Sequence, residues 1–202
     1  MATTIVLNGP SSAGKSSLGA ALQLVWDGPL LVTGVDSFLA GFPEHLFSLP
    51  GDDGAPGPVT TGVHVVPGRG PTPSWVPALG PDGQLLMRAA HRAWRAVAQA
   101  GLDQVIDHVI LDTATRDDAL DVLSELDVLW VGVHCDVNEL VRRENARADR
   151  FRGFASGTWA QVHDGMTYDL TLDTTSTGAA ELAAQVVDVL GRGVPAGHTS
   201  NA

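Results

Sequence analysis

Cysteine, lysine and long apolar runs are all scarce in this chain of 202 residues. A single cysteine, Cys135, cannot form an intramolecular disulfide, which excludes a disulfide-stapled fold and fits a reducing compartment. No apolar run approaches the length that crosses a bilayer, and the first residues lack the basic and apolar segments of a signal peptide. We therefore expect a cytoplasmic protein without a membrane partner.

Positive charge is also scarce. The formal net charge is −11, and general binding to nucleic acid needs basic groups that neutralise phosphates, so we expect no nucleic-acid partner. Of the 12 basic residues only Lys15 is a lysine. Five of the arginines fall in one short stretch: Arg142, Arg143, Arg147, Arg150 and Arg152. An acidic protein that concentrates positive charge in this way is expected to hold an anion there.

Short β-branched and aliphatic runs alternate with segments of helical spacing. We expect strands at 3–8, 30–35, 104–111, 128–135 and 168–172, and helices at 15–26, 37–47, 84–100, 116–126, 137–150 and 179–190. This alternation predicts a three-layer α/β fold in which helices cover both faces of a five-stranded parallel sheet. Ligands of such sheets bind at the carboxyl ends of the strands.

The length fits one domain, which we place at residues 1–192, followed by a disordered tail at 193–202. Residues 49–83 are dense in glycine and proline. We interpret them as an irregular insertion near the acceptor site, with a hairpin around 63–66. Oligomeric state stays open, and a homo-oligomer is compatible with the sequence.

The segment from Gly9 to Ser16 matches the phosphate-binding pattern G-x-x-x-x-G-K-[ST] in full, between a predicted strand and a predicted helix. A chance glycine-rich turn rarely has this context. Backbone N–H groups of such a loop bind phosphate, Lys15 reaches the β- and γ-phosphates, and the Ser16 hydroxyl is a ligand of Mg²⁺. We therefore expect Mg²⁺ and ATP, with GTP left open, as cofactors. The residues expected to bind the nucleotide are Gly9, Ser11, Ser12, Ala13, Gly14, Lys15, Ser16, Ser17 and, after the last strand, Thr174.

Missing motifs narrow the class of phosphate-loop protein. With one lysine the chain has no N-K-x-D motif for guanine, and it has no His-Arg-Asp catalytic loop, which argues against Ras-like GTPases and protein kinases. A short chain with one phosphate loop and a late arginine cluster indicates a small-molecule kinase of the P-loop kinase fold.

Two carboxylates are candidates for the chemistry. Asp36 follows the second predicted strand, where it would lie beside the γ-phosphate and accept the proton of an attacking hydroxyl; the alternative is a helix N-cap. Asp107 interrupts an apolar strand and is expected near Mg²⁺, unless it makes a structural hydrogen bond. His108 is expected to be structural. Ser37 and Phe38, next to Asp36, are expected to contact the acceptor.

The arginine cluster spans the end of a predicted helix and the loop after it. Phosphoryl-transfer enzymes place arginines on a lid that neutralises the transferring group and excludes water. We expect a lid near 142–158 and catalytic roles for Lys15, Asp36, Arg147 and Arg150, with Arg152 left open. A solvated charged face is the alternative.

Several segments resemble chloramphenicol phosphotransferases over most of the chain, except at about 49–83. They are Ile5–Ser17, Gly34-Val-Asp-Ser37, Leu126-Asp-Val-Leu-Trp-Val-Gly-Val133, Glu144-Asn-Ala-Arg-Ala-Asp-Arg150 and Tyr168-Asp-Leu-Thr-Leu-Asp-Thr-Thr175. The resemblance implies an ATP-dependent kinase that phosphorylates a hydroxyl of an antibiotic as self-resistance, with Asp36 as the general base.

Two departures from that family concern the site. The family has two aspartates where this chain has Asp107 and His108, and residues 49–83 appear longer than their counterpart. A remodelled wall implies a different acceptor, either chloramphenicol-like or a nucleoside antibiotic such as a capuramycin, to which Phe47 and Trp75 could offer aromatic contacts. The alternatives are a metabolic kinase of the shikimate or gluconate type and a nucleotide-binding protein without catalysis.

Overall fold

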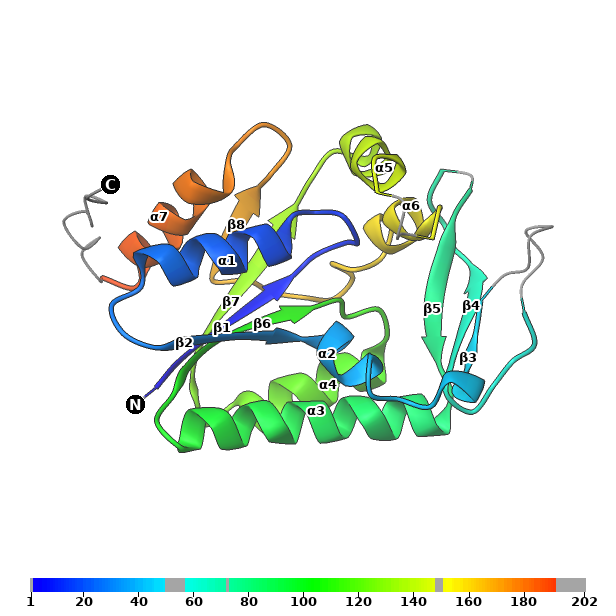
Figure 1. The fold of residues 1–202 in the computed structure, drawn as a ribbon, viewed down its shortest axis with the longest axis horizontal. Helices are drawn as coiled ribbons and strands as arrows, with labels where there is room; N and C mark the ends of the chain where they lie inside the picture. Colours follow the sequence, from blue (N-terminus) through cyan, green and yellow to red (C-terminus); the bar gives the residue numbers. More distant parts are fainter. Residues whose placement is uncertain (1, 50–56, 72, 148–150, 192–202) are drawn as a thin grey trace, which may run out of the picture.

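The computed structural model describes residues 2–49, 57–71, 73–147 and 151–191 (Figure 1). Its main sheet has five strands in the order β2-β6-β1-β7-β8, and every neighbouring pair is parallel. The strands are β1 (Thr3–Asn8), β2 (Leu30–Gly34), β6 (Asp103–His108), β7 (Asp127–His134) and β8 (Leu170–Asp173). The predicted parallel sheet is therefore confirmed, with the strand before the phosphate loop at its centre.

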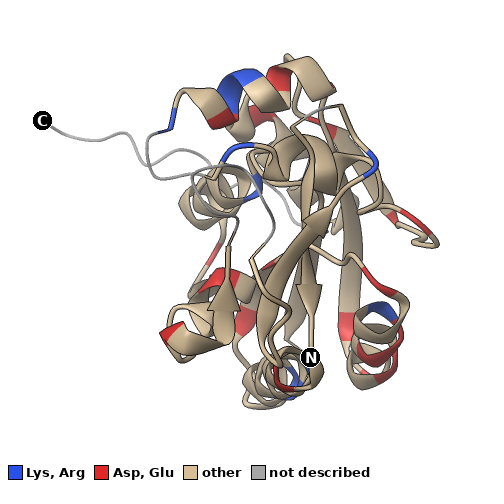
Figure 2. Ribbon diagram, turned by 90° about the vertical axis from the view of Figure 1, so that its right-hand side faces the viewer, with Lys and Arg blue, Asp and Glu red and all other residues tan. Residues whose placement is uncertain are grey.

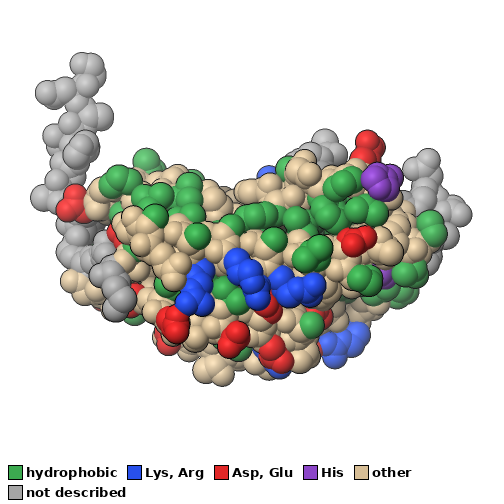
Figure 3. Space-filling model, turned by 90° about the horizontal axis from the view of Figure 1, so that it is seen from below, with side chains coloured by type: hydrophobic (Ala, Val, Ile, Leu, Met, Phe, Trp, Pro, Cys, Tyr) green, Lys and Arg blue, Asp and Glu red, His purple; other side chains and the backbone are tan. Residues whose placement is uncertain are grey.

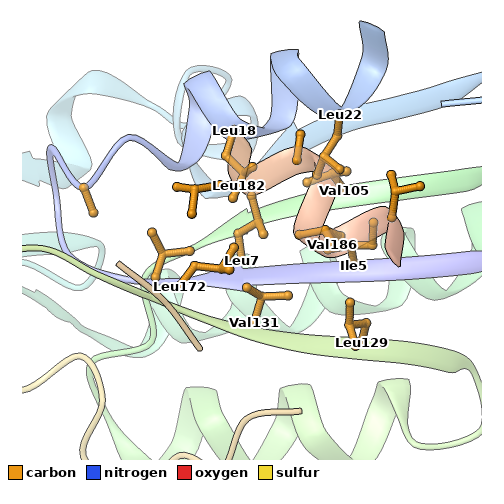
Figure 4. Packing of buried hydrophobic residues seen from close by; sticks show 14 of the residues in the cluster. Ile5, Leu7, Leu18, Leu22, Val105, Leu129, Val131, Leu172, Leu182 and Val186 are labelled. Carbon is orange, nitrogen blue, oxygen red and sulfur yellow. The ribbon is translucent and has the colours of Figure 1, made fainter. Parts of the chain in front are cut away.

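Helices cover both faces of this sheet. Figure 1 shows α1 (Lys15–Val25) and α7 (Ala179–Val189) on one face, and α3 (Pro81–Gln99) and α4 (Thr113–Leu123) on the other. Side chains alternate along β1: Ile5 and Leu7 pack toward α1 and α7, as Figure 4 shows, while Val6 packs with Trp94 of α3. Each buried side chain of this size contributes about 1.5–3 kcal/mol, so the core holds the strand ends in fixed positions.

A second, smaller sheet lies mostly within residues 49–83, which we expected to be irregular. It consists of β3 (Phe47–Ser48), β4 (Val63–Pro67) and β5 (Trp75–Leu79). The expected hairpin is present as the antiparallel β4–β5 pair, so irregularity was the wrong prediction for these two segments. β3 lies just before residue 49, and its first residue, Phe47, was predicted to be the end of a helix. The prolines of this stretch argued against strands. Pro77 is nevertheless part of β5, because β5 is an edge strand, where a missing N–H is tolerated.

Shorter helices complete the chain. In place of one helix at 37–47 the structure has α2 (Val35–Leu39) and a 3-10 turn, η1 (Glu44–Leu46). The helix predicted at 137–150 is α5 (Val137–Asn145), and it is followed by α6 (Phe154–Trp159), which the sequence pattern did not indicate. The predicted tail at 193–202 lies outside the described residues. None of the described helices is both long enough and apolar enough to cross a membrane.

Candidate functional site

A cleft of about 950 Å³ opens at the carboxyl ends of the parallel strands. One half of it, which we call the nucleotide half, is lined by the phosphate loop, α5 and the segment after β8. The other, which we call the acceptor half, is lined by the ends of β2 and β6 and by the small sheet. Lys15 and Asp36 both line this one cleft, and the sequence pattern predicted such a shared site at the strand ends.

The phosphate loop has the shape that its glycines allow. Gly14 lies in the left-handed region at φ 87°, and Ser12 adopts a similar φ of 65° without being glycine. A Cβ on Gly9 would lie 2.4 Å from the carbonyl oxygen of Val133, so only glycine lets β1 leave the sheet here. The buried Lys15 ammonium donates to the carbonyl oxygens of Gly9 and Pro10, at 2.9 Å each.

Asp107 meets the phosphate loop from the end of β6. Its carboxylate accepts a hydrogen bond from the Ser16 hydroxyl at 2.8 Å and lies 3.5 Å from the Lys15 ammonium. A hydroxyl beside a carboxylate is an oxygen donor set that suits Mg²⁺. No group of three or more His, Cys, Asp or Glu side chains among the described residues could hold a metal ion. An ion here would therefore complete its shell with phosphate and water oxygens, as Mg²⁺ usually does.

Asp36 is an exposed residue in the first turn of α2. The N-cap of that helix is Gly34, so the alternative interpretation of Asp36 as a helix N-cap is wrong. Ser37 lines the cleft beside it. Phe38 does not: its ring packs edge-on against Trp94 with centroids 5.5 Å apart, so the predicted acceptor contact of Phe38 is corrected to a core contact.

Thr174 joins the phosphate loop to the arginine cluster. Its hydroxyl donates to the carbonyl oxygen of Ala13 at 2.8 Å, and its own carbonyl oxygen accepts from Arg143 at 2.6 Å. Arg143 also donates to Glu139, and hydrogen bonds from Arg142 and Arg143 lower the pKa of that carboxyl to about 2. Figure 2 shows basic and acidic residues side by side on α5, the helix at the top of that view.

The structure places the cluster only partly as expected. Arg147 lines the nucleotide half, together with Arg142 and Arg143. Arg150 lies outside the described residues. Arg143 was not among the predicted site residues, because its contact with Thr174 depends on how α5 packs against the end of β8, which spacing within the helix does not reveal.

The acceptor half is mainly apolar, and most of it was not predicted. Its apolar lining residues are Leu39, Phe47, Leu49, Val63, Val65, Pro77, Leu79, Met87, Val109 and Leu111. Its charged lining residues, within the described chain, are Asp36, Asp107 and Asp112. The basic residues of the described cleft lining, Lys15, Arg142, Arg143 and Arg147, come from the phosphate loop and from α5 with the segment after it, and Lys15 lies next to Asp107. Asp112 is the N-cap of α4 and accepts from the Thr115 N–H at 2.8 Å and from Gln84 at 3.2 Å. Trp75 does not line the cleft, whereas Phe47 does.

A buried polar network that sequence reasoning missed fixes the base of the phosphate loop. The Asn8 amide donates to the Tyr168 hydroxyl at 2.7 Å and to the Val162 carbonyl, and it accepts from the Ile110 N–H. The Tyr168 hydroxyl lies 2.7 Å from Nδ1 of His163, whose ring stacks on His134. Burial lowers the pKa of His163 to about 4, so this histidine is neutral at pH 7. The network ties the end of β1 to two later segments of the chain.

A second buried chain of polar groups lies outside the cleft, under α3 and α4. The Val109 N–H donates to Nδ1 of His108, so Nε2 of His108 carries the proton and donates to Nε2 of His91 at 3.0 Å. Nδ1 of His91 donates to Asp118 at 2.6 Å, and Arg92 pairs with Asp118 at the surface. Figure 3 views the molecule from the side of these helices and shows basic and acidic side chains close together. This arrangement agrees with a structural role for His108.

Comparisons with known proteins fit this geometry. Residues 2–191 match a family model described as chloramphenicol phosphotransferase-like protein. A Mycobacterium tuberculosis H37Rv protein named "Putative O-phosphotransferase Rv2636" is 32% identical over 194 residues, which cover 90% of this chain and 79% of that protein.

Two solved structures share the fold. A sugar kinase from Janibacter superposes with a TM-score of 0.63 at 18% identity, covering 95% of each chain. The Mycobacterium tuberculosis APS kinase CysC, in complex with AMPPNP and APS, gives a TM-score of 0.62 at 19% identity over 94% of this chain and 98% of the other. The three-layer arrangement is thus that of P-loop kinases.

Proposed function

Since the chain belongs to the chloramphenicol phosphotransferase-like family and is a small-molecule phosphotransferase, we propose that its acceptor is an antibiotic. In this proposal the γ-phosphoryl group of ATP, or of GTP, passes to a hydroxyl of a chloramphenicol-like compound or of a nucleoside antibiotic such as a capuramycin. Phosphorylation would confer resistance by removing the free hydroxyl.

One observation carries the proposal: a phosphate loop and an exposed carboxylate line the two halves of the same cleft. The nucleotide half supplies backbone N–H groups and the Lys15 ammonium for the phosphates. The acceptor half supplies Asp36 at the point where an acceptor hydroxyl would meet the γ-phosphate. A phosphoryl group can then move across the cleft without either substrate leaving its own half.

Each residue has a distinct role in this reaction. Asp36 accepts the proton of the acceptor hydroxyl, whose oxygen attacks the γ-phosphorus while the bond to the β-phosphate oxygen breaks. Lys15 and Arg147 neutralise the charge that develops on the phosphoryl oxygens. Ser16 and Asp107 would hold Mg²⁺, which when bound with the nucleotide would offset the negative charge of the β- and γ-phosphates.

The acceptor half favours a neutral or cationic compound. The small sheet and the segments after β2 and β6 offer carboxylates and apolar side chains, while the basic groups of the described lining lie on the side of the phosphate loop and α5. A carboxylate or sulfate held against the small sheet would therefore lie beside carboxylates and away from those basic groups. This speaks against acids of the shikimate and gluconate type. An antibiotic with an apolar or aromatic body and a free hydroxyl fits the apolar wall better.

A kinase assay with a panel of acceptors tests the proposal. The protein is incubated with Mg²⁺, ATP or GTP, and hydroxylated antibiotics that include chloramphenicol and a capuramycin, with shikimate and gluconate as acidic controls. Mass spectrometry should detect an added phosphoryl group on at least one antibiotic and on neither acid. Phosphorylation of an acid alone would overturn the proposed acceptor class.

A further inference from the structure

The short helix α6 contacts the phosphate loop through one hydroxyl group. The Ser11 N–H donates to Thr158 Oγ1 at 2.9 Å, and Thr158 Oγ1 in turn donates to the carbonyl oxygen of Phe154 at 2.6 Å. Thr158 is 2% exposed, so water does not compete for these bonds. The first turn of the phosphate loop is therefore attached to α6 by a hydrogen bond that no other side chain of that helix makes in the described structure.

The same helix packs tightly against the wall of the acceptor half. The Trp75 N–H, at the start of β5, donates to the Gly153 carbonyl oxygen at 2.9 Å, and the Ser156 hydroxyl donates to the carbonyl oxygen of Pro73. A Cβ on Gly157 would lie only 2.0 Å from the Trp75 carbonyl oxygen. Backbone lies on backbone here, and such an interface transmits a displacement instead of absorbing it in flexible side chains.

A buried carboxylate attaches α6 to the arginine-bearing helix α5. Glu144, which is 2% exposed, accepts hydrogen bonds from the N–H groups of Gly153 and Ala155 at 2.7 Å each. Gly153 is the N-cap of α6 and Ala155 lies in its first turn, where a negative charge is favourable. The helix thus has a fixed position relative to Arg143 and Arg147 as well as to the loop and the wall.

From these contacts we propose that α6 couples nucleotide binding to the acceptor wall, with Thr158 as the positioning residue. Phosphates that order the loop hold Ser11, Ser11 holds Thr158, and α6 then holds the β4–β5 hairpin in the shape that receives the acceptor. The inference deepens the proposed function and rests on it, because only the proposed function assigns the acceptor to this half of the cleft. Coupling between two sites of one protein typically changes affinity about 5- to 150-fold.

Hydrogen exchange followed by mass spectrometry tests the coupling without any acceptor. Peptides that cover residues 63–79 are compared in the protein alone and with saturating Mg²⁺ and ADP. We expect the nucleotide to slow exchange in these peptides at least 5-fold, although the nucleotide binds in the other half of the cleft. If exchange in these peptides does not change in the wild-type protein, the proposal is wrong.

Variants of Thr158 test whether the coupling between the nucleotide and the β4–β5 hairpin passes through the Thr158 hydroxyl. Thr158→Val keeps the shape of the side chain but removes the hydroxyl, so nucleotide should still bind at saturation without slowing exchange at 63–79; Thr158→Ser should restore the effect. Thr4→Val removes a buried hydroxyl of β1 that belongs neither to α6 nor to the cleft lining, and it should leave the nucleotide effect intact. An undiminished effect in Thr158→Val would contradict the assigned role.

A second variant keeps the test decisive if Thr158→Val does not fold. Ser156→Ala removes the bond to Pro73 on the wall side and leaves the Ser11 contact in place, so it should weaken the nucleotide effect on 63–79 without weakening nucleotide binding. Failure to phosphorylate any antibiotic would not bear on this measurement. Conversely, an active antibiotic kinase without the exchange effect would refute the coupling alone.

Discussion

At the scale of single residues, the cleft contains a buried cation, Lys15, and an exposed carboxylate, Asp36. Lys15 is 5% exposed and already engaged with two carbonyl oxygens and Asp107, which pre-orients its ammonium toward the loop. Asp36 is exposed to the cleft, where it can meet a hydroxyl that arrives from solvent. We therefore expect substitutions of Lys15 to change nucleotide binding and substitutions of Asp36 to change turnover.

Replacing Asp36 by asparagine tests its role as the base. Asp36→Asn keeps the shape but cannot take up a proton, so we expect kcat to fall about 10²- to 10⁴-fold, while the dissociation constant of the nucleotide stays within about a factor of two. Steady-state kinetics and calorimetry measure the two quantities. Asp27→Asn, at an exposed position after α1, serves as the control. An unchanged kcat in Asp36→Asn would remove the assignment.

His108 makes the stability of the protein depend on pH. Burial, together with smaller effects of the neighbouring His91 and Lys15, lowers its pKa from 6.5 to about 3 in the folded state. Between these two values the unfolded chain binds a proton that the folded chain does not, so stability falls as pH decreases below 6.5. One such group contributes a slope of about 1.4 kcal/mol per pH unit, and above pH 6.5 its contribution is constant.

Urea unfolding at pH 7 and pH 5 measures this slope. His108→Gln removes the titrating ring while keeping a polar side chain next to His91, and it should reduce the loss of stability between the two pH values by about 1–2 kcal/mol. The comparison is between slopes, so a general loss of stability in the variant does not affect it. Equal slopes in the two proteins would show that His108 does not titrate in this way.

The sequence indicated where residues lie when a motif fixes the geometry, whereas their roles stay predictions. The positions of Lys15, Ser16 and Asp107 follow from a phosphate loop after a central strand and from the parallel pairing of Leu7 with Asp107. The prediction for Phe38 was wrong, because neighbouring residues on a helix point in different directions: Asp36 faces the cleft, whereas Phe38 packs against Trp94. The rotation of α2 against α3 decides that direction, and it depends on tertiary packing.

At the scale of elements, α4 shows how one side chain can serve both a helix and the cleft. Asp112 caps the helix through the Thr115 N–H and hydroxyl and also presents a carboxylate to the acceptor half. The cap needs an oxygen acceptor, which asparagine provides as well as aspartate does. The negative charge is therefore not required for the helix.

Two substitutions separate these roles. Asp112→Ala should lower the free energy of unfolding by about 1 kcal/mol, within a range of about 0.5–2, whereas Asp112→Asn should change it by only a few tenths. Chemical denaturation measures both values. Loss of stability in Asp112→Asn as large as that in Asp112→Ala would mean that the charge, and not the cap, holds α4.

Elements were predictable where burial on both faces leaves a continuous apolar run. The inner strands come closest to that pattern, and β1 is buried at every position. The edge strand β8 is shorter and has exposed positions at Thr171 and Asp173. The small sheet and α6 were not predictable in full, since their sequences mix glycine, proline and polar residues. Their conformations depend on each other, as shown by the close backbone contacts of Gly157 and Gly70 across the interface.

At the scale of the whole molecule, nucleotide binding should stabilise the fold. A ligand that binds only the folded state at 100 times its dissociation constant adds about 2.7 kcal/mol. We therefore expect Mg²⁺ and ATP to raise the melting temperature by several degrees in a thermal-shift experiment. AMP, which lacks the β- and γ-phosphates, is the matched control and should have a much smaller effect.

Lys15→Ala gives this prediction its sharpest form. The variant removes the cation that reaches the β- and γ-phosphates, so the shift with Mg²⁺ and ATP should fall toward the value seen with AMP. Loss of the buried ammonium also frees Asp107, so the melting temperature without nucleotide is measured alongside. A full nucleotide-dependent shift in Lys15→Ala would contradict the phosphate-loop assignment.

The central position of β1 has a consequence for synthesis of the chain. Its residues pair with strands that are made about a hundred residues later, as in the contacts of Thr4 with Gln104 and Val128. A ribosome must therefore deliver both β6 and β7 before the first strand has neighbours on its two sides. Until then a strand that is buried at every position of the folded protein stays without its sheet, and chaperones would meet the nascent protein in that state.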